Sequence, residues 1–349
     1  MSKIPTLVVH IGIGKTGSTA IQNALAKSKD SLVSNSVQYW GLNLESVESP
    51  KSEWFPWQQK TGTAYLQNLS RQQACDQVEA ALRKALDHLP KNGTAIWSNE
   101  GLYERPEILL PVAERLLDER SVDIRVIACV RSLSRWLPSA YRQWGVRHKT
   151  LPGRVPSFLA WAFERESFLR YGSKLAIWDQ RLGKRLELIN YDSSDDIVST
   201  FLSRLDCWPQ GCPIVPTTRD YATPSATQLA LWALVNDQSD QPVAPTAIQR
   251  LLQSSGLLQR KYHSFQPERL LVRKESIKIL ERILANDQQL VNQMLDQRGE
   301  PALVADTSPK EEEPAVDMSQ LIALLADLII AQNQRIETLE KAVRPKPSS

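Results

Sequence analysis

The sequence predicts a three-layer α/β/α fold with a central parallel sheet, followed by a C-terminal coiled-coil helix. Over residues 1–299, short β-branched apolar runs alternate with longer helical stretches, as in parallel sheets whose strands are joined by helices. A glycine-rich turn directly follows the first of these runs. After residue 320, apolar residues recur at steps of three and four, the spacing of a coiled coil.

The elements are expected at definite places in the chain. The predicted strands cover residues 6–11, 94–97, 123–130 and 186–191. The predicted helices cover residues 19–25, 72–89, 107–120, 135–147, 158–181 and 197–205. Residues 225–295 have a mostly helical pattern. We therefore assign residues 1–299 to one α/β domain.

The composition of the 349-residue chain excludes several protein classes. With 42% hydrophobic and 23% charged residues, it is typical of a soluble globular protein. No apolar run approaches the ~20 residues that a membrane span requires. The 4 cysteines are too few for a disulfide scaffold in so long a chain. We interpret them as reduced thiols, which indicates a cytoplasmic protein.

The C-terminal 50 residues differ in character from the domain before them. Residues 300–319 contain three prolines and have 6 acidic against 1 basic side chain, which predicts a linker. Residues 320–343 then follow a heptad pattern: Ile322, Leu325, Ile329, Gln332, Ile336, Leu339 and Val343. β-Branched residues at a with Leu at d favour a parallel two-stranded coil, and one polar core residue can fix its register. We expect a homodimer, the alternative being a helix docked on its own domain.

The glycine-rich turn, Gly12 to Ser18, has the composition of an anion-binding loop. Backbone N–H groups of such a turn, together with the N-terminus of the next helix, attract phosphate. Three glycines allow close approach, Lys15 adds a positive charge, and Ser18 and Thr19 add hydroxyl donors. A plain tight turn would not explain a lysine and two hydroxyls among these glycines.

Two common nucleotide motifs fit this loop poorly. A Walker A loop would require a glycine where the chain has Val9. The spacing of Gly12, Gly14 and Gly17 matches a dinucleotide-binding motif, but no acidic residue ends a strand ~20 residues later. The loop is therefore poorly explained either as a Walker A motif or as a dinucleotide-binding motif.

A second basic element follows the strand at residues 123–130. Arg131 lies directly after this strand, and Ser139 follows eight residues later within a predicted helix. Ligands of open α/β sheets bind beyond the carboxyl ends of the strands. Because the arginine fork matches phosphate oxygens, Arg131 and Ser139 are predicted to hold a second phosphate.

The loop Ile11–Thr19 and the pair Arg131 and Ser139 together resemble the PAPS-dependent sulfotransferases, specifically their carbohydrate (heparan-sulfate-like) branch and its bacterial relatives. The resemblance covers most of residues 5–295, although Ser132-Leu133 stands where the family commonly has Asp-Pro. It implies a P-loop-like fold and transfer of the sulfuryl group of PAPS (3′-phosphoadenylyl sulfate) to a hydroxyl or amine. The implied acceptor is a carbohydrate or glycolipid, the product nucleotide is PAP, and no metal is required.

The resemblance also implies roles for individual residues. The 5′-phosphosulfate would be held by Gly14, Lys15, Thr16, Gly17, Ser18 and Thr19. Arg131 and Ser139 would hold the 3′-phosphate, and Lys15 would neutralise the leaving oxygen. Glu100, just after the strand at residues 94–97, is the first candidate for the base that takes the acceptor proton, and His148 is the second. Their structural alternatives are a helix N-terminal acid and a solvated residue at a helix end.

Further features suggest how ligands are attracted. Residues 124–190 carry 13 basic and 4 acidic side chains, a net charge of +9, and Arg142, Arg147, Lys149 and Arg154 are candidates for steering anions. Five tryptophans are candidates for a sugar-stacking platform: Trp40, Trp54, Trp57, Trp136 and Trp144. No nucleic-acid-binding module is recognised. The rival functions are a P-loop nucleotide kinase and a non-catalytic scaffold with the same fold.

Overall fold

The computed structural model describes residues 4–47, 50–59, 69–120, 122–205, 208, 226–237, 239–243 and 272–304, with nine single positions between 318 and 339. The chain divides into two compact units. Unit 1 comprises Met1–Trp136, Arg170–Asp220 and Arg282–Asp306, and unit 2 comprises Leu137–Leu169, Tyr221–Glu281 and Thr307–Ser349. Cys207, Cys212 and most of the predicted linker, residues 305–317, lie outside the described residues.

Unit 1 is built on a five-stranded sheet in which every strand pair is parallel. In the order β2-β3-β1-β4-β5, β1 is the central strand. The strands are β1 (Thr6–His10), β2 (Val37–Tyr39), β3 (Thr94–Ser98), β4 (Asp123–Val130) and β5 (Leu186–Asn190). The predicted α/β fold with a central parallel sheet is therefore confirmed, and four of the strands lie where they were expected. Strand β2 was not predicted, because three residues are too few for a periodic pattern.

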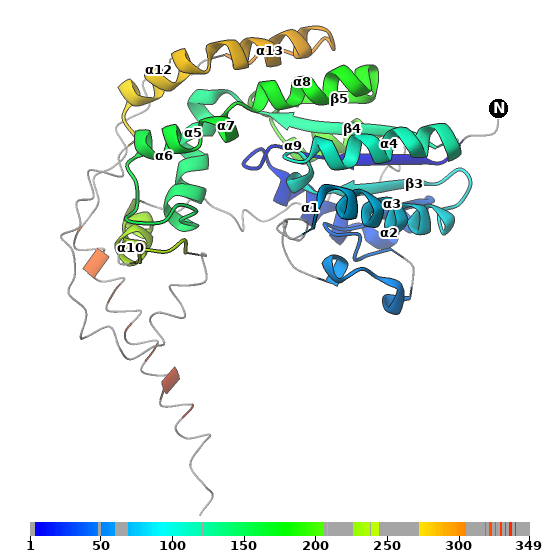
Figure 1. Cartoon of the computed structure of the whole chain (residues 1–349), viewed down its shortest axis with the longest axis horizontal. Helices are drawn as coiled ribbons and strands as arrows, with labels where there is room; N and C mark the ends of the chain where they lie inside the picture. Colours follow the sequence, from blue (N-terminus) through cyan, green and yellow to red (C-terminus); the bar gives the residue numbers. More distant parts are fainter. Residues whose placement is uncertain are drawn as a thin grey trace, which may run out of the picture. The chain divides into compact units, whose positions relative to one another are not determined.

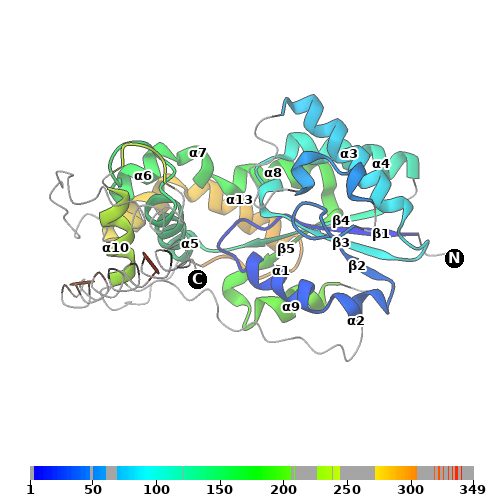
Figure 2. The ribbon, with the colours of Figure 1, turned by 90° about the horizontal axis from the view of Figure 1, so that it is seen from below.

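Helices cover both faces of this sheet, as Figures 1 and 2 show. Helices α1, α2 and α9 lie on one face, and α3, α4 and α8 lie on the other (Figure 2). The helices of unit 1 are α1 (Ser18–Lys27), α2 (Lys29–Val33), α3 (Arg71–Asp87), α4 (Pro106–Arg120), α8 (Tyr171–Leu182), α9 (Ile197–Ser203) and α13 (Ala285–Asp296). Its short 3-10 turns are η1 (Lys51–Glu53), η2 (Pro56–Gln59), η4 (Glu100–Leu102), η6 (Gly183–Arg185) and η7 (Tyr191–Ser193).

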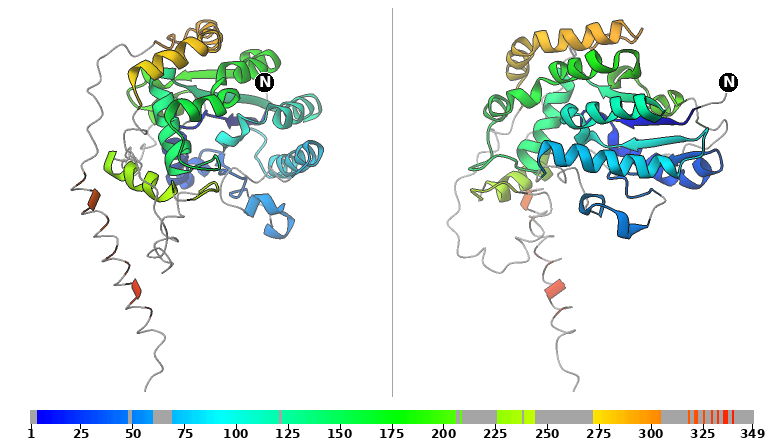
Figure 3. Two further views of the ribbon diagram at one scale, coloured as in Figure 1. Left: turned by 60° about the vertical axis from the view of Figure 1, so that its left-hand side comes forward. Right: turned by 45° about the vertical axis from the view of Figure 1, so that its right-hand side comes forward.

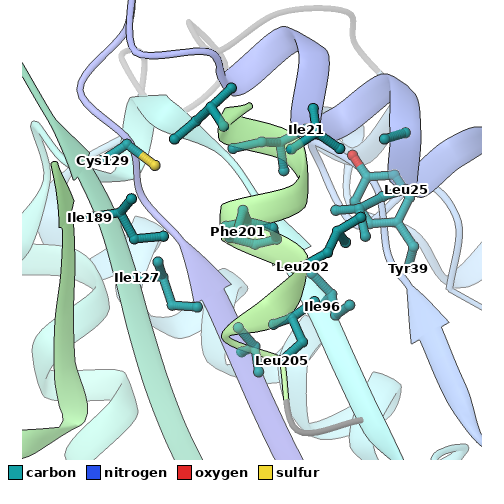
Figure 4. Packing of buried hydrophobic residues seen from close by; sticks show 14 of the residues in the cluster. Ile21, Leu25, Tyr39, Ile96, Ile127, Cys129, Ile189, Phe201, Leu202 and Leu205 are labelled. Carbon is teal, nitrogen blue, oxygen red and sulfur yellow. The ribbon is translucent and has the colours of Figure 1, made fainter. Parts of the chain in front are cut away.

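Each face of the sheet has its own apolar core. On one face, Val8 of β1 belongs to a buried cluster that includes Ile21 of α1 and Phe201 of α9 (Figure 4). On the other face, Leu7 and Val9 line an apolar layer with side chains of α3, α4 and α8, and α3 and α4 lie side by side (Figures 1 and 3). Successive side chains of a strand point to opposite faces, so a strand covered on both sides must be apolar throughout. The continuous apolar run of β1 meets this requirement.

Helix α3 illustrates how local sequence sets the start of an element. Ser70 accepts a hydrogen bond from the backbone N–H of Gln73, and the Gln73 side chain accepts one from the backbone N–H of Ser70. This reciprocal capping box satisfies two donors that the first helical turn would leave unpaired. The helix begins at Arg71 for this reason.

Unit 2 is helical in its described part. Helix α5 (Leu133–Tyr141) starts in unit 1 and continues into unit 2 as the π-helix η5 (Arg142–Arg147). The remaining helices are α6 (Phe158–Glu164), α7 (Glu166–Leu169), α10 (Ala226–Asn236) and α12 (Lys274–Ile283), the last ending in unit 1. The single helix expected over residues 158–181 was wrong: it is divided into α6, α7 and α8, with breaks at Arg165 and Arg170. Neither break has a glycine or proline to mark it in the sequence.

The packed structure of unit 1 continues beyond Gly299, the last residue of the predicted domain. The side-chain amide of Asn190, on β5, donates to the carbonyl of Pro301 at 3.0 Å. Leu303 is buried, and its backbone N–H donates to the side chain of Asn292 on α13 at 2.8 Å. Residues 300–304, which open the predicted linker, are therefore part of the packed structure.

Helix α8 is capped by a residue from a distant helix. Asp287, on α13, is buried and accepts hydrogen bonds from the backbone N–H groups of Gly172 and Ser173 at 2.5 and 2.7 Å. A Cβ at residue 172 would lie 2.1 Å from the carbonyl oxygen of Asp287, so only glycine allows this approach. The carboxylate satisfies two amides of the first turn and complements the helix dipole.

Replacing this cap is expected to destabilise the protein. Asp287→Ala leaves the N–H group of the buried Gly172 and that of the more exposed Ser173 without their acceptor, so the free energy of unfolding should fall by about 2–4 kcal/mol. Chemical denaturation measures this change. Asp296→Ala, at an exposed position of the same helix, is the control and should change stability by less than ~0.5 kcal/mol. Equal stabilities for the two variants would contradict the capping role.

Candidate functional site

The carboxyl ends of the strands bring three predicted segments of unit 1 to one edge of the sheet. In the register of the sheet, His10 at the end of β1 pairs with Ser98 at the end of β3, and β4 lies on the other side of β1. The loop before α1, Glu100 after β3 and Arg131 after β4 all follow these ends. The connection from β1 leads toward β2 and that from β4 leads toward β5. The ligand crevice of an open α/β sheet lies at such a switch point.

The loop between β1 and α1 has the backbone of an anion nest. Lys15 and Gly17 have positive φ angles, 68° and 88°, and alternating left-handed residues direct successive N–H groups into one concavity. At residue 17 a Cβ would also lie 2.7 Å from Ile197, so glycine is required there twice over. Of the three glycines in the pattern, Gly17 is the one with a positive φ angle, and the other positive φ angle of the loop belongs to Lys15.

Two hydrogen bonds from distant residues fix the orientation of the loop peptides. Trp136 Nε1 donates to the carbonyl of Gly14 at 3.0 Å, and Arg131 Nη1 donates to the carbonyl of Lys15 at 3.4 Å. In a trans peptide the N–H group points away from the carbonyl. The N–H groups of Lys15 and Thr16 are therefore held on the side of the loop opposite to these donors.

The hydroxyls of the loop differ in what they can offer to a ligand. Thr16 is buried, and its hydroxyl donates to the carbonyl of Ile13 at 3.3 Å, so only its backbone N–H is open to a ligand role. Ser18 is 4% exposed, and its Oγ has no hydrogen-bond partner among the described residues. A buried hydroxyl without a partner costs free energy unless a ligand completes it. Ser18 therefore fits an anion bound at the start of α1, while Thr19 is only partly buried there.

His10 lies beneath the loop as a neutral, packed residue. It is fully buried, its Nδ1 lies 2.8 Å from Ser98 Oγ, and its ring packs against Phe201. Burial lowers the pKa of His10 to about 4. A Cβ at residue 12 would lie 2.8 Å from both His10 Nε2 and Ser18 Oγ, so Gly12 lets the loop pass directly over this side chain.

Arg131 is held by residues that the sequence analysis did not single out. Its Nε donates to Asp192 Oδ1 at 3.4 Å, and its guanidinium lies over the ring of Tyr191, 4.8 Å from the ring centre. Asp192 Oδ2 also accepts from the backbone N–H of Ser132 at 2.7 Å. The hydroxyl of Tyr171 donates to the carbonyl of Arg131 at 2.5 Å. These contacts fix both the backbone and the side chain of Arg131.

Glu100 is linked to the helix that follows the loop. Gln22 lies one turn after Ser18 on α1, and its Nε2 donates to Glu100 Oε2 at 2.9 Å and to the carbonyl of Ser98 at 3.4 Å. Asn99, directly before Glu100, accepts from the backbone N–H of Gly101 at 2.8 Å. One carboxylate oxygen of Glu100 is thus oriented by the chain, and the residue is partly exposed.

Two of the predicted site residues, Ser139 and His148, belong to unit 2. Ser139 lies on α5, eight residues after Arg131, and is partly exposed. His148 follows the π-helix directly, and burial, together with the charge of Arg165, lowers its pKa. The structure therefore brings Lys15, Arg131 and Glu100 to one sheet edge in unit 1.

Many of the basic residues within residues 124–190 are neutralised by ion pairs, and two of the four candidates for steering anions are held by the fold. At least seven of the 13 basic residues form ion pairs: Arg125 with Glu187, Arg131 and Arg135 with Asp192, Arg154 with Asp237, Lys174 with Glu104, Arg181 with Glu114, and Arg185 with Asp123. Most of these acidic partners lie outside residues 124–190, the range over which the net charge of +9 was counted. Lys149 is fully buried, with its Nζ 3.0 Å from the carbonyl of Asn236. Lys149 and Arg154 therefore have structural roles.

The predicted tryptophan platform was wrong for three of its members. Trp40, Trp57 and Trp136 are buried. Trp136 is instead the residue that holds the phosphate loop through Gly14. Trp54 and Trp144 are partly exposed, and Trp144 packs edge-on against Phe168.

Neither a metal centre nor a membrane-spanning helix is found among the described residues. They contain no group of three or more His, Cys, Asp or Glu side chains that could hold a metal ion. No helix in this part of the chain is long and apolar enough to cross a membrane. The described cysteines, Cys75 and Cys129, are free and buried, and burial raises the pKa of Cys129 to about 12.

The comparison with solved structures includes a distant likeness. The chain is similar to the crystal structure of a sulfotransferase from Alicyclobacillus acidocaldarius, at 12% sequence identity and a TM-score of 0.38. The match covers 85% of this chain and 97% of that chain. No protein-family model and no curated protein matches the chain. A likeness at this level carries no argument about activity, so function must be argued from the residues of the site.

The buried His10 predicts a pH dependence of stability. Because its pKa is about 4 in the folded protein and 6.5 in the unfolded chain, the unfolded chain binds more protons between these values. The free energy of unfolding should therefore fall by about 3 kcal/mol through His10 as the pH drops from neutral to about 4.

His10→Asn removes this contribution and should be less stable at neutral pH, with a flatter decline below it. Urea denaturation at a series of pH values measures both curves. The lowered pKa of His148 contributes in the same direction, but equally in both proteins, so the difference between the curves isolates His10. Parallel curves would contradict a neutral buried His10.

Proposed function

We propose that the protein is a sulfotransferase, which moves the sulfuryl group of PAPS to a hydroxyl or amine of a carbohydrate or glycolipid. One observation carries the proposal: the hydrogen bond from Arg131 Nη1 to the carbonyl of Lys15. It joins the arginine after β4 to the lysine of the phosphate loop. Two cationic groups at one sheet edge suit a nucleotide with two separate anionic groups, and PAPS has a 5′-phosphosulfate and a 3′-phosphate.

In this proposal the loop holds the 5′ end of the donor. The N–H groups of the loop and of the first turn of α1 have no partners within the helix and can donate to phosphate oxygens. The unpartnered Ser18 Oγ supports a ligand at this position. Lys15 neutralises the charge that develops on the phosphate oxygen as its bond to sulfur breaks.

Arg131 and Ser139 hold the 3′-phosphate in the proposal. A guanidinium presents several N–H donors in one plane and can bind phosphate through two of them. Asp192 and Tyr191 support this role because they fix the guanidinium before any ligand arrives. Ser139 is included because the resemblance of the sequence to the sulfotransferases implies it.

Glu100 is the proposed base. The oxygen of the acceptor attacks sulfur, the bond from sulfur to the donor phosphate breaks, and the acceptor proton passes to the carboxylate. The hydrogen bond from Gln22 orients one carboxylate oxygen, which supports a positioned group rather than a merely solvated acid. Such positioning is a main source of catalysis in group transfer. His148 is the alternative base, since its lowered pKa keeps it neutral near neutral pH.

PAP binding tests the donor site. Lys15→Ala and Arg131→Ala should each weaken binding about 10- to 100-fold in isothermal titration calorimetry, because a charge-assisted hydrogen bond contributes ~1.5–3 kcal/mol. Arg131→Ala should weaken the binding of 5′-AMP, which has no 3′-phosphate, less than it weakens the binding of PAP, because 5′-AMP loses only the orientation of the loop by Arg131. Lys29→Ala, at an exposed position of α2, is the matched control and should bind PAP normally.

Unchanged PAP affinity in both site variants would exclude the assigned residues. Thermal stabilisation by ATP with Mg²⁺, and none by PAP, would favour the rival nucleotide kinase. PAP binding without sulfate transfer to any member of a broad acceptor panel would favour the non-catalytic scaffold.

The base and its positioning residue can be tested together. Glu100→Gln should reduce sulfate transfer from radiolabelled PAPS by about 10²- to 10⁴-fold, to a residual rate that can still be measured, while leaving PAP affinity unchanged. Gln22→Leu should reduce the transfer rate about 10-fold, again at unchanged PAP affinity, because it removes the donor that orients Glu100. In the Glu100→Gln background, Gln22→Leu should have no further effect.

Gln72→Leu is the control for Gln22→Leu, since it removes a similar glutamine–carboxylate hydrogen bond on the exposed side of α3. It should leave transfer unchanged. Additive losses from Gln22→Leu and Glu100→Gln would show that Gln22 does not act through Glu100. Loss of transfer in His148→Ala but not in Glu100→Gln would assign the base to His148.

A further inference from the structure

The C-terminal segment exposes one apolar ridge. Each of its described positions, from Met318 to Leu339, is helical. The three isoleucines at the a positions of the heptad, Ile322, Ile329 and Ile336, are 62%, 58% and 47% exposed, and Leu339 at a d position is 58% exposed. Large side chains therefore repeat along one stripe without a covering surface among the described residues.

The exposed ridge argues against the alternative that this helix docks on its own domain. A docked amphipathic helix would bury the a positions first, but here they remain open to solvent while Leu321, next to the first of them, is 4% exposed. An isolated helix of this length is marginal in water, so the segment needs a partner for its apolar face. The residue types at a and d are those of a two-stranded coil.

We propose that the occupant of this ridge is the same segment of a second copy, forming a parallel, in-register homodimer over residues 320–343. A second copy presents isoleucine to isoleucine at three a layers and valine to valine at the fourth, Val343. It also places the amide of Gln332 at a d position opposite its own counterpart, where the two side chains can hydrogen-bond. A shifted register would set that amide against leucine, so Gln332 fixes the alignment.

Charge at the edges of the ridge sets the parallel direction. In the heptad frame, Arg335 occupies a g position, and Glu340 occupies the e position five residues later. Arg335 is helical and exposed. In a parallel coil, a g residue of one chain faces the e residue of the next heptad in the other chain. Arg335 of each copy would therefore pair with Glu340 of the other copy, which gives two such ion pairs in the dimer. An antiparallel coil sets g against g and e against e, which gives no such pair.

Sedimentation equilibrium on the full chain tests the proposal. Wild type should have the mass of a dimer. The double variant Ile329→Asp with Ile336→Asp should have the mass of a monomer, and its far-UV circular dichroism should lose no more helical signal than residues 320–343 contribute. Val304→Asp replaces an apolar residue outside the heptad that is even more exposed than Ile329 and Ile336, and this variant should remain dimeric. A monomeric wild type, or a dimeric double variant, would overturn the proposal.

A charge-swap pair tests the direction of the helices. Arg335→Glu alone and Glu340→Arg alone should each raise the dimer dissociation constant severalfold, because like charges then face each other. Mixed together, the two variants should form a heterodimer with an affinity at least that of wild type, since every g–e contact becomes complementary. A mixture no tighter than either variant alone would overturn the parallel arrangement.

Discussion

The candidate site depends on the orientation of two peptide groups, those whose carbonyls belong to Gly14 and Lys15. Trp136 and Arg131 bind these carbonyls from one side, so the following N–H groups are held on the other. A loop rich in glycine would otherwise sample many conformations, and each N–H would have to be ordered when an anion binds. The two donors supply this order in advance. Arg131 is also proposed to bind the 3′-phosphate of PAPS. Its hydrogen bond to the carbonyl of Lys15 therefore connects the residues proposed to bind the 5′ and 3′ ends of the nucleotide.

This arrangement is supported by contacts deeper in unit 1. Asp192 holds both the guanidinium of Arg131 and the backbone of Ser132, and Tyr171 holds the carbonyl of Arg131 from the start of α8. Helix α8 is in turn capped by Asp287 of α13. A connected series of hydrogen bonds thus leads from a helix near the end of the domain to the sheet edge. Buried networks of this kind stabilise a single geometry when all their members are satisfied.

Sequence reasoning found the parts of the site that have a local signal. The β-branched strands, the glycine spacing and the basic residue after a strand predicted the sheet, the loop and the position of Arg131. The supporting residues have no such signal, because each is far in sequence from the residue that it binds. Trp136 is hydrogen-bonded to Gly14 and Asp192 to Arg131, at separations of 122 and 61 residues. Gln22 is hydrogen-bonded to Glu100 at a separation of 78 residues. For the same reason, the net charge of a sequence window was misleading, because the carboxylates that neutralise it lie elsewhere in the chain. Only the folded topology shows these pairs.

A crystal structure of the complex with PAP would show both proposed phosphate sites at once. The 5′-phosphate should lie within hydrogen-bond distance of the backbone N–H groups between Lys15 and Thr19, with Ser18 Oγ as a donor. The 3′-phosphate should lie at the guanidinium of Arg131, with the Gly14 and Lys15 carbonyls still bound to Trp136 and Arg131. A nucleotide bound elsewhere, or a loop that turns its peptides over to receive it, would exclude the proposed donor site.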